Sequence, residues 1–466
     1  MKILGVVITD GVGFRNFILS DFIKEAEEKF ETIVILSCLP KTAYENLNIN
    51  CKIIELDVFE ENFITWVFRK TKEVAHLQLF AKDFFGINDN FEAAKIKNKS
   101  NRGIVTNLII KWTSIFKSEK WIQCYDLLQQ KSFSNNKITK DYLVLLKDEK
   151  ITSLFFTHQR PPFIAPLIYA SKKLKIISTT FIFSWDNLAS KGRMAGNFDK
   201  YLVWSDLMKS ELLYFYKKIQ PNAVNVVGAP QFEPYILDRY KVEKDDFFAE
   251  FELDSEKPTI CYSCGDISTS KNDTLYIETI ANAIINKKLV MDVNLFVRTS
   301  PAEEPTRLMY LAKNYPFIKW NYPKWFQTRA DHQEAWSQRI PTVQDVKDLR
   351  SILTYSDLSI NICSTMSLDF MLFDKPVINT VFGNANNGLL NDQRFLKFAH
   401  YEKVVQSGAV AIAKNEIELI DSINFSLQNP NQRLQSQKDI LAIQIGKPLE
   451  DTSRRIAEAL LAIDNR

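Results

Sequence analysis

Ser364 and Thr365 stand between an apolar, strand-like run and a short helical pattern, in the sequence SINICSTMSLDF. A helix that starts at the carboxyl end of a strand presents unpaired N–H groups, and these groups together with the helix dipole favour a phosphate. Asp369 follows about one helical turn later, where its carboxylate could accept a hydrogen bond from a ribose hydroxyl. The alternative is that Ser364 or Thr365 only caps the helix.

Two further polar segments in the second half of the chain also end strand-like runs. Ser263 to Ser270 is small and polar around Gly265, so its backbone could approach a phosphate closely. Arg298, in the sequence VRTSP, could bind a diphosphate through two parallel hydrogen bonds. Ordinary turn chemistry is the alternative for each segment alone. Together the segments predict a metal-independent nucleotide-diphosphate site formed by Ser263, Gly265, Arg298, Ser364, Thr365 and Asp369.

The first half of the chain carries candidate acid–base groups after strand-like runs. His158 follows an apolar run that ends at Thr157, and it is one of only four histidines. Asp186 lies in the densest polar cluster, SWDNLASKGRM, and a carboxylate beside a cleft could deprotonate a hydroxyl. His158 could instead be a structural hydrogen-bonding residue. Asp186 could instead cap a helix or pair with Lys191 or Arg193.

The elements that must position these residues alternate between buried strands and helices. Ile3–Ile8 leads into a glycine turn, a helical pattern and a second apolar run at Thr32–Ser37, which is typical of parallel sheets. The same alternation returns from Thr259 onward. The predicted fold class is α/β, with two Rossmann-like, doubly wound parallel-sheet domains that face a central cleft. The predicted division is an N-terminal domain at 1–235, a linker at 236–257, a C-terminal domain at 258–445, and a helix at 446–466 that packs back across the domains.

Composition and charge exclude several classes of protein. Hydrophobic residues make up 46% of the 466 residues, charged residues make up 25% and the net charge is +3, so neither disorder nor nucleic-acid binding is indicated. The six cysteines are expected to be free thiols, because the one CxxC pair, Cys261 and Cys264, lacks a partner pair for zinc. The chain shows neither a signal-peptide pattern nor a membrane-spanning run, so a cytoplasmic location is expected.

Residues 62–150 interrupt the alternating pattern and read as a helical insertion with interleaved aromatic residues and lysines. Over residues 61–150, 16 Lys and Arg stand against 10 Asp and Glu, so the segment carries +6 while the rest of the chain carries −3. Such an insertion could rest on an anionic membrane surface, at the inner face of the cytoplasmic membrane, or hold an acidic ligand. The alternative is a helical subdomain with ordinary solvated lysines.

The chain resembles the GT-B class of glycosyltransferases, and in particular bacterial enzymes of surface-polysaccharide synthesis distantly akin to the CDP-glycerol glycerophosphotransferases. The segments that carry the resemblance are SWDNLASKG at 184–192, YLVWSD at 201–206, VVGAPQF at 226–232, VRTSP at 297–301 and CSTMSLDFMLFDKPVI at 363–378. The resemblance implies a sugar moving from a nucleotide-sugar in the C-terminal domain to a hydroxyl of a glycan or lipid-linked acceptor in the N-terminal domain. The nucleotide-sugar is then a substrate, and no cofactor or metal is expected.

By this resemblance Asp186 or His158 would be the catalytic base. The acceptor-binding residues would come from the loop DGVGFRN, which is not a GxGxxG dinucleotide motif, and from the cluster around Asp186. The residues so assigned are Asp10, Gly13, Arg15, Asn16, Asn187 and Lys191.

The chain departs from the glycerophosphotransferase group at two places. That group carries a His near the position of Asp186, and an Arg-x-His-Pro motif where this chain has VRTSP. Both departures favour sugar transfer over glycerophosphate or polyol-phosphate transfer. A UDP-sugar epimerase of the same fold is a second possibility, although the His- and Glu-rich site expected for it is not found in the sequence. A non-catalytic nucleotide-sugar-binding protein is a third.

Overall fold

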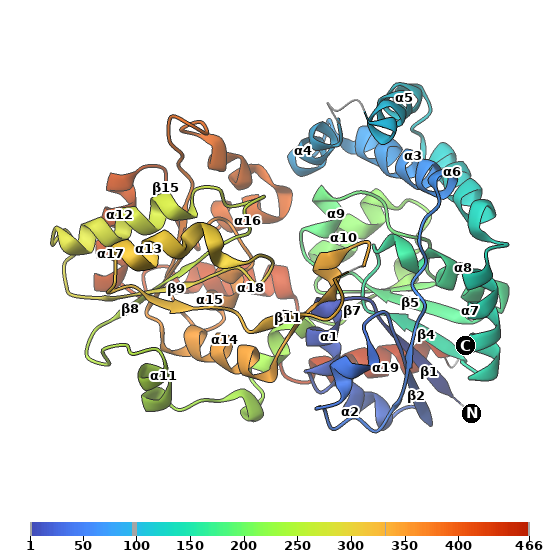
Figure 1. Ribbon diagram of the computed structural model, residues 1–466, viewed down its shortest axis with the longest axis horizontal. Helices are drawn as coiled ribbons and strands as arrows, with labels where there is room; N and C mark the ends of the chain where they lie inside the picture. The colour runs from blue at the N-terminus through green and yellow to red at the C-terminus, as the bar shows by residue number, and fades with distance from the viewer. Residues whose placement is uncertain (1, 96–99, 331, 465–466) are drawn as a thin grey trace. The chain divides into compact units, whose positions relative to one another are not determined.

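A computed structural model describes residues 2–95, 100–330 and 332–464 (Figure 1). Its contacts divide the chain into two compact units. Unit 1 contains Met1–Glu233, Gln327–Ile340 and Gln444–Arg466, and unit 2 contains Pro234–Phe326 and Pro341–Ile443. Residues 236–257, expected as a linker, therefore belong to unit 2, and the C-terminal helix belongs to unit 1.

Unit 1 is built on a parallel sheet in which the described strands follow the order β3-β2-β1-β4-β5-β6-β7. The two central strands, β1 and β4, are buried along their whole length, as expected for parallel strands covered by helices on both faces. The strands are β1 (Ile3–Ile8), β2 (Thr32–Ser37), β3 (Lys52–Glu55), β4 (Ser153–Phe156), β5 (Ile177–Phe181), β6 (Lys200–Val203) and β7 (Val224–Val226). The helices next to this sheet are α1 (Gly11–Ile18), α2 (Phe22–Glu27), α8 (Ala165–Lys173), α9 (Asn187–Ser190), α10 (Asp206–Phe215) and α19 (Thr452–Asp464).

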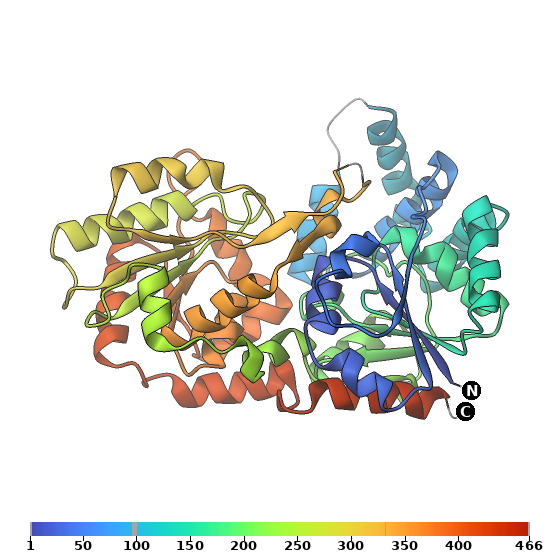
Figure 2. The same ribbon diagram turned by 60° about the horizontal axis from the view of Figure 1, so that its bottom comes forward.

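The insertion between β3 and β4 is helical, as its sequence predicts. It contains α3 (Phe63–Phe80), α4 (Phe85–Ala94), α5 (Asn101–Ile115), α6 (Glu119–Phe133) and α7 (Lys137–Asp148). Helix α3 is the centre of the group and packs against α4, α5 and α6. Figures 1 and 2 both show α5 at the periphery of unit 1. Among the described helices of the chain, none has both the length and the apolar character needed to cross a bilayer.

Unit 2 contains a second parallel sheet, whose described strands follow the order β10-β9-β8-β13-β14-β15. These strands are β8 (Thr259–Ser263), β9 (Asn294–Arg298), β10 (Lys319–Asn321), β13 (Leu358–Asn361), β14 (Val377–Thr380) and β15 (Ala411–Ala413). A separate two-stranded ribbon pairs β11 (Trp325–Gln327) with β12 (Arg339–Pro341), and its residues are divided between unit 1 and unit 2. The helices are α11 (Lys244–Glu250), α12 (Asp273–Ile285), α13 (Met309–Asn314), α14 (Val343–Tyr355), α15 (Met366–Met371), α16 (Ala399–Gln406), α17 (Glu416–Gln428) and α18 (Leu434–Ile445). The core is apolar and includes Ile260, Leu295, Ile360 and Ile378 from four adjacent strands.

Both sheets confirm the predicted doubly wound, parallel α/β architecture. Each sheet reverses its winding at one point, between β1 and β4 in unit 1 and between β8 and β13 in unit 2. The carboxyl ends of the two strands beside such a switch point form the crevice in which open α/β sheets bind ligands. Asp10 and His158 follow β1 and β4, while Gly265 and Ser364 follow β8 and β13.

Candidate functional site

Asp10 and His158 meet at the switch point of unit 1. The His158 Nδ1 atom lies 2.7 Å from Asp10 Oδ2, and the two side chains are 4% and 0% exposed. Gly13 makes this approach possible, because a Cβ atom there would lie 2.6 Å from Thr157 Oγ1. Asp10 and Gly13 thus position His158, and the acceptor-binding role that the resemblance implies for them stays a prediction.

The Asp10 carboxylate is held in its ionised form. It caps helix α1, accepting hydrogen bonds from the N–H groups of Val12 at 3.0 Å and Gly13 at 2.8 Å, and it also accepts one from the Thr9 hydroxyl at 2.8 Å. Burial alone would raise the pKa of Asp10, but the attraction of His158 and these hydrogen bonds outweigh it and lower the pKa. A buried carboxylate thus persists because it has an unusually complete set of partners.

His158 is neutral and has one free nitrogen. Burial lowers its pKa below the ordinary value, and the opposing attraction of Asp10 does not offset this. Because Asp10 is ionised, the Nδ1–H donates to it, which leaves the lone pair on Nε2. The buried Nε2 atom has no hydrogen-bond partner among the described residues, and the ring stacks on Phe183 with centroids 3.9 Å apart. This arrangement suits a general base, because the free Nε2 atom can accept a proton.

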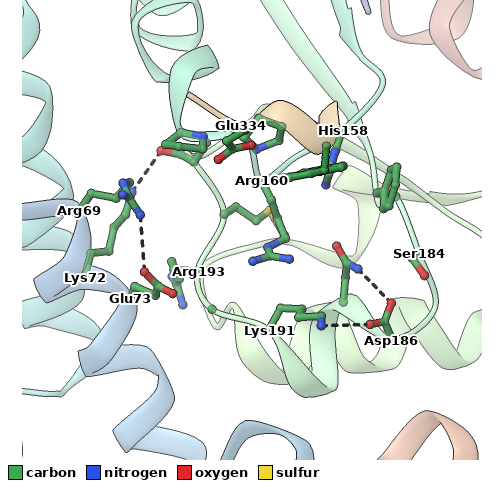
Figure 3. A pocket seen from close by; sticks show the side chains of 18 residues that line it. Arg69, Lys72, Glu73, His158, Arg160, Ser184, Asp186, Lys191, Arg193 and Glu334 are labelled. Atoms are coloured by element: carbon green, nitrogen blue, oxygen red, sulfur yellow. Dashed lines mark hydrogen bonds and ion pairs between the residues drawn. The ribbon is translucent and has the colours of Figure 1, made fainter. Parts of the chain in front are cut away.

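His158 lines a cavity of about 420 Å³ within unit 1 (Figure 3). Figure 3 shows Arg69, Lys72 and Glu73 of α3 on one side of the cavity, and Ser184, Asp186 and Lys191 on the other. The remaining lining residues are Arg160, Pro161, Pro162, Phe183, Asn187, Gly192, Arg193, Met194, Ala195, Glu334 and Trp336.

Most of the cations of this cavity are already paired. Arg69 binds Glu61 at 2.7 Å and lies 3.6 Å from Glu73, and Lys72 binds Asp126 at 2.6 Å. Lys191 and Arg193 pair with Asp186 and Glu119, respectively. Burial raises the pKa of Glu73, but Lys70, Arg69 and Arg160 together lower it, so this carboxylate is ionised. The cavity is therefore a charged, partly neutralised pocket.

Arg160 differs from the other cations. Its guanidinium makes no ion pair or hydrogen bond with any residue that the structure describes, and its Nε atom is buried without a partner. It stands two residues after His158 and lines the same cavity. An unpaired guanidinium beside a free imidazole nitrogen is suited to hold an anionic group next to the base.

The structure brings Asp186, Asn187 and Lys191 into this cavity with His158. Asp186 stands before helix α9 without accepting a capping hydrogen bond from its backbone, lies 3.7 Å from Lys191 Nζ, and accepts a hydrogen bond from Asn187 Nδ2 at 3.1 Å. Buried Gln159 fixes the loop, because it donates to Asn187 at 3.0 Å and accepts from the Phe183 N–H at 3.1 Å.

Arg15 and Asn16, the other two residues expected at the acceptor, are not among those that line this cavity. Asn16 is buried, and its side-chain oxygen accepts a hydrogen bond from Arg15 Nε at 3.2 Å. Their part in acceptor binding stays a prediction.

Sequence reasoning missed the cavity residues that come from other parts of the chain. Arg69, Lys72 and Glu73 belong to the insertion, where only the charge density of RKTKE gave a signal. Glu334 and Trp336 come from Gln327–Ile340, which belongs to unit 1 although it follows much of unit 2 in the sequence. Its packing depends on Gly11, because a Cβ atom there would lie 1.6 Å from the Arg339 carbonyl oxygen.

In unit 2 the expected phosphate-binding segments end adjacent strands, as the sequence predicts. Ser263 is the last residue of β8, and the Gly265 carbonyl accepts a hydrogen bond from Arg307 at 2.8 Å. Gly265 allows the loop to close on itself, since a Cβ atom would lie 2.6 Å from Ser270 Cβ. Asp369 is buried in α15 and accepts a hydrogen bond from the Tyr235 hydroxyl.

The turn that carries Ser364 and Thr365 is held by Asn361, the last residue of β13. The Asn361 side-chain oxygen accepts hydrogen bonds from Ser364 N at 3.1 Å, Ser364 Oγ at 3.2 Å and Ser367 Oγ at 3.1 Å. Cys363 takes a left-handed conformation with φ of 39°, which is strained for a residue with a side chain. The Ser364 hydroxyl accepts a hydrogen bond from the Met366 N–H at 3.2 Å, so it does act locally as a cap.

Arg298 lies at the carboxyl end of β9, but its guanidinium is occupied. It is buried, it binds both carboxylate oxygens of Asp345 at 3.1 and 3.0 Å, and it donates to Asn321. The geometry gives Arg298 a structural role in joining β9 to α14, and a contact with diphosphate stays a prediction.

Comparison with known proteins leaves the fold as the shared feature. No family model matches the chain, and no curated protein matches it. Solved structures do match over nearly the whole chain. A UDP complex of MnaA from S. aureus matches with a TM-score of 0.56 at 10% identity, and the match covers 100% of this chain and 97% of the MnaA chain.

Two further solved structures match the chain over nearly its whole length. A glycosyltransferase from Rickettsia africae has a TM-score of 0.52 at 13% identity, with 99% of this chain and 98% of that chain covered. A UDP-GlcNAc 2-epimerase from Neisseria meningitidis, bound to UDP-GlcNAc, has a TM-score of 0.51 at 12% identity, with 99% and 100% covered. The chain has the GT-B fold. GT-B proteins of different activity share it, so the fold alone does not choose a reaction. The likeness to CDP-glycerol glycerophosphotransferases stays a prediction.

The structural role of Arg298 can be tested by Arg298→Met. The change leaves the Asp345 carboxylate buried without its cation, so the free energy of unfolding should fall by about 3–5 kcal/mol. Urea unfolding of the full chain measures this. Arg454→Met is the matched control, because Arg454 is exposed and its ion pairs are long, at 3.5 Å to Asp451 and 3.8 Å to Glu458. Equal stability of the two variants would show that Arg298 is free for a ligand.

Proposed function

We propose that this protein is a nucleotide-sugar-dependent glycosyltransferase in which His158 is the catalytic base. The observation that carries the proposal is the buried Asp10–His158 pair, whose free Nε2 lines a cavity at the switch point of unit 1. The acceptor binds in this cavity, and the nucleotide-sugar binds at the corresponding strand ends of unit 2. The GT-B fold supports this assignment, because its structural relatives include proteins solved with UDP and UDP-GlcNAc.

The proposed reaction is a displacement at the anomeric carbon of the sugar. An acceptor hydroxyl attacks that carbon and its proton moves to His158 Nε2, while the bond to the nucleoside diphosphate breaks and the diphosphate leaves with its electron pair. Asp10 keeps the Nδ1–H in place and stabilises the imidazolium that forms. Asp186, which lies in the same cavity, is the second candidate for the base.

The nucleotide-sugar would contact unit 2 at Ser263, Gly265, Ser364 and Thr365, with Asp369 near the ribose. These residues follow β8 and β13, the two strands beside the switch point of that sheet, where ligands of open α/β sheets bind. The proposal requires no metal at this site.

A UDP-sugar epimerase is the second candidate function. One of the solved structures similar to this chain is a UDP-GlcNAc 2-epimerase, and its chain is covered as fully as that of the glycosyltransferase. A neutral histidine backed by a carboxylate could also move a proton on a sugar carbon. The two functions differ in one respect, since an epimerase needs no acceptor.

Nucleotide binding is the first property to test. UDP, GDP, CMP and ADP are added separately to the full chain. At 100 times its Kd, the nucleotide of the true substrate should raise the free energy of unfolding by about 2.7 kcal/mol through mass action, and the Tm should rise accordingly. The matching nucleotide-sugar is then incubated without an acceptor. Formation of an epimer would favour the second candidate, and no shift with any of the nucleotides would contradict both.

The base can be tested through pH dependence. Because burial lowers the pKa of His158, the ascending limb of kcat/KM should lie below pH 6.5 and the rate should be flat near pH 7. His158→Ala should lower kcat about 10²- to 10⁴-fold and abolish this limb. Asp10→Asn keeps an oxygen to cap α1 while removing the charge, so it should lower kcat with less loss of stability than Asp10→Ala. Normal turnover in His158→Ala, with loss in Asp186→Asn, would assign the base to Asp186.

The unpaired Arg160 predicts an acceptor that carries a carboxylate or phosphate. Acceptors ending in glucuronic acid and in glucose differ only at C6, where the acid has a carboxylate and glucose has a hydroxymethyl group. Arg160→Gln should lower kcat/KM for the acidic acceptor about 10- to 100-fold and leave the neutral one nearly unchanged. Arg160→Lys should recover part of the loss, and Arg454→Gln on the surface is the control. An equal effect on both acceptors would contradict this role.

A further inference from the structure

Helix α5 has its apolar residues on the outside. Ile104, Leu108, Trp112 and Ile115 are between 51% and 75% exposed. The residues that face α3 and the rest of unit 1 are instead mostly small or polar, and they are Gly103, Thr106, Ile109 and Thr113. A helix that served only as a cover for the protein core would have the opposite arrangement.

The exposed residues form one continuous stripe. At 3.6 residues per turn, positions 104, 108, 112 and 115 fall within about 80° of the helix circumference. The hydroxyls of Thr106 and Thr113 donate to backbone carbonyls one turn back, at 2.8 and 2.7 Å, so the inner face needs no polar partner elsewhere. The polar groups of the inner face are therefore satisfied within α5, and the apolar stripe remains on the exposed side of the helix.

An aromatic cluster extends the stripe beyond the end of α5. The Phe116 ring lies between those of Trp112 and Trp121, with centroid distances of 4.4 and 4.8 Å. The Trp112 indole N–H donates to the Tyr125 hydroxyl at 2.9 Å, which fixes its ring in this position. Tryptophan side chains with one apolar and one polar edge are enriched where hydrocarbon meets water at a membrane surface.

The charge around the stripe is positive. Residues 100–120 contain Arg102, Lys111, Lys117 and Lys120 but only one acid, Glu119. Glu119 is already bound by Arg193, so it does not neutralise these cations. Helix α5 itself contains no acidic residue. The surface would therefore be attracted to an anionic layer.

We infer that α5 lies flat on an anionic lipid surface, with the Ile104–Ile115 stripe among the acyl chains and Lys111 and Lys120 at the headgroups. The combination of a one-sided apolar stripe, interfacial tryptophans and flanking cations is that of an interfacial helix. At 15 residues and 1.5 Å per residue the helix is about 22 Å long, so it rests on the bilayer and does not cross it. The inference goes beyond the proposed function and does not depend on it, because no residue of α5 lines the cavity beside His158.

Vesicle sedimentation of the full chain tests this inference. Phosphatidylglycerol-containing vesicles should bind the protein, and pure phosphatidylcholine vesicles should bind it much less. The double variant Leu108→Gln/Ile115→Gln should lower binding about tenfold or more, because two side chains no longer enter the hydrocarbon. Its matched control is Ile417→Gln/Ile443→Gln, at positions of unit 2 that are 72% and 50% exposed, and it should bind as the parent does.

The charge contribution is tested separately. Lys111→Glu/Lys120→Glu should also lower binding to anionic vesicles about tenfold or more, whereas the control Lys403→Glu/Lys414→Glu should not. Absence of binding to anionic vesicles by the parent protein would overturn the inference. The inference would also be overturned if the parent protein is a dimer that binds no vesicles and the α5 double variant is a monomer, because the stripe would then pair two copies of the chain. The Tm shift with nucleotide should be the same in every variant, which separates this test from that of the proposed function.

Discussion

The buried negative charge of Asp10 is the constraint around which the site of unit 1 is built. A carboxylate with no exposed surface stays ionised only if donors surround it. Its donors are the first N–H groups of α1, the Thr9 hydroxyl and the His158 ring, so the helix must begin directly after β1 and β4 must end beside it. Gly13 follows from the same requirement, because any Cβ atom there would collide with Thr157. The geometry of the Asp10–His158 pair and the local fold therefore depend on the same contacts.

In unit 2 the turn at the switch point of the sheet is held by neutral side chains instead of by a buried charge. At the end of β13 the Asn361 amide holds the Ser364 turn, and Asn379 donates to Asn361 at 3.1 Å and accepts from the Tyr401 hydroxyl at 2.8 Å. These bonds hold Cys363 in a backbone conformation that it would not adopt alone. The residues of this network are all uncharged, and the N–H and hydroxyl of Ser364 both donate to Asn361, so the network fixes the shape of the turn.

The sequence predicted what local patterns determine. Buried parallel strands are continuous apolar runs, so Ile3–Ile8 and Thr32–Ser37 were predicted with their observed bounds, and polar residues such as Asp10 were placed at the carboxyl edge of the sheet. Contacts between distant segments left no such pattern. Asp345 lies 47 residues from Arg298, so the arginine looked free in the sequence, and nothing near Trp336 indicates that it contacts the His158 ring. The pairing of His158 with Asp10 also left no pattern in the sequence, although each of the two residues had been predicted separately to belong to the site.

The choice between the two candidate bases follows from how each would change its surroundings by accepting a proton. Asp186 is partly exposed and already stabilised as an anion by Lys191 and Asn187, so protonation would forfeit both interactions. His158 begins neutral beside an ionised, buried carboxylate. When it accepts a proton, the pair changes from a single buried negative charge to an ion pair at 2.7 Å, and the attraction of Asp10 opposes, without cancelling, the cost of burying the imidazolium. In the proposed reaction, His158 therefore has in Asp10 a buried partner that would stabilise its imidazolium, whereas Asp186 would retain its contact with Lys191.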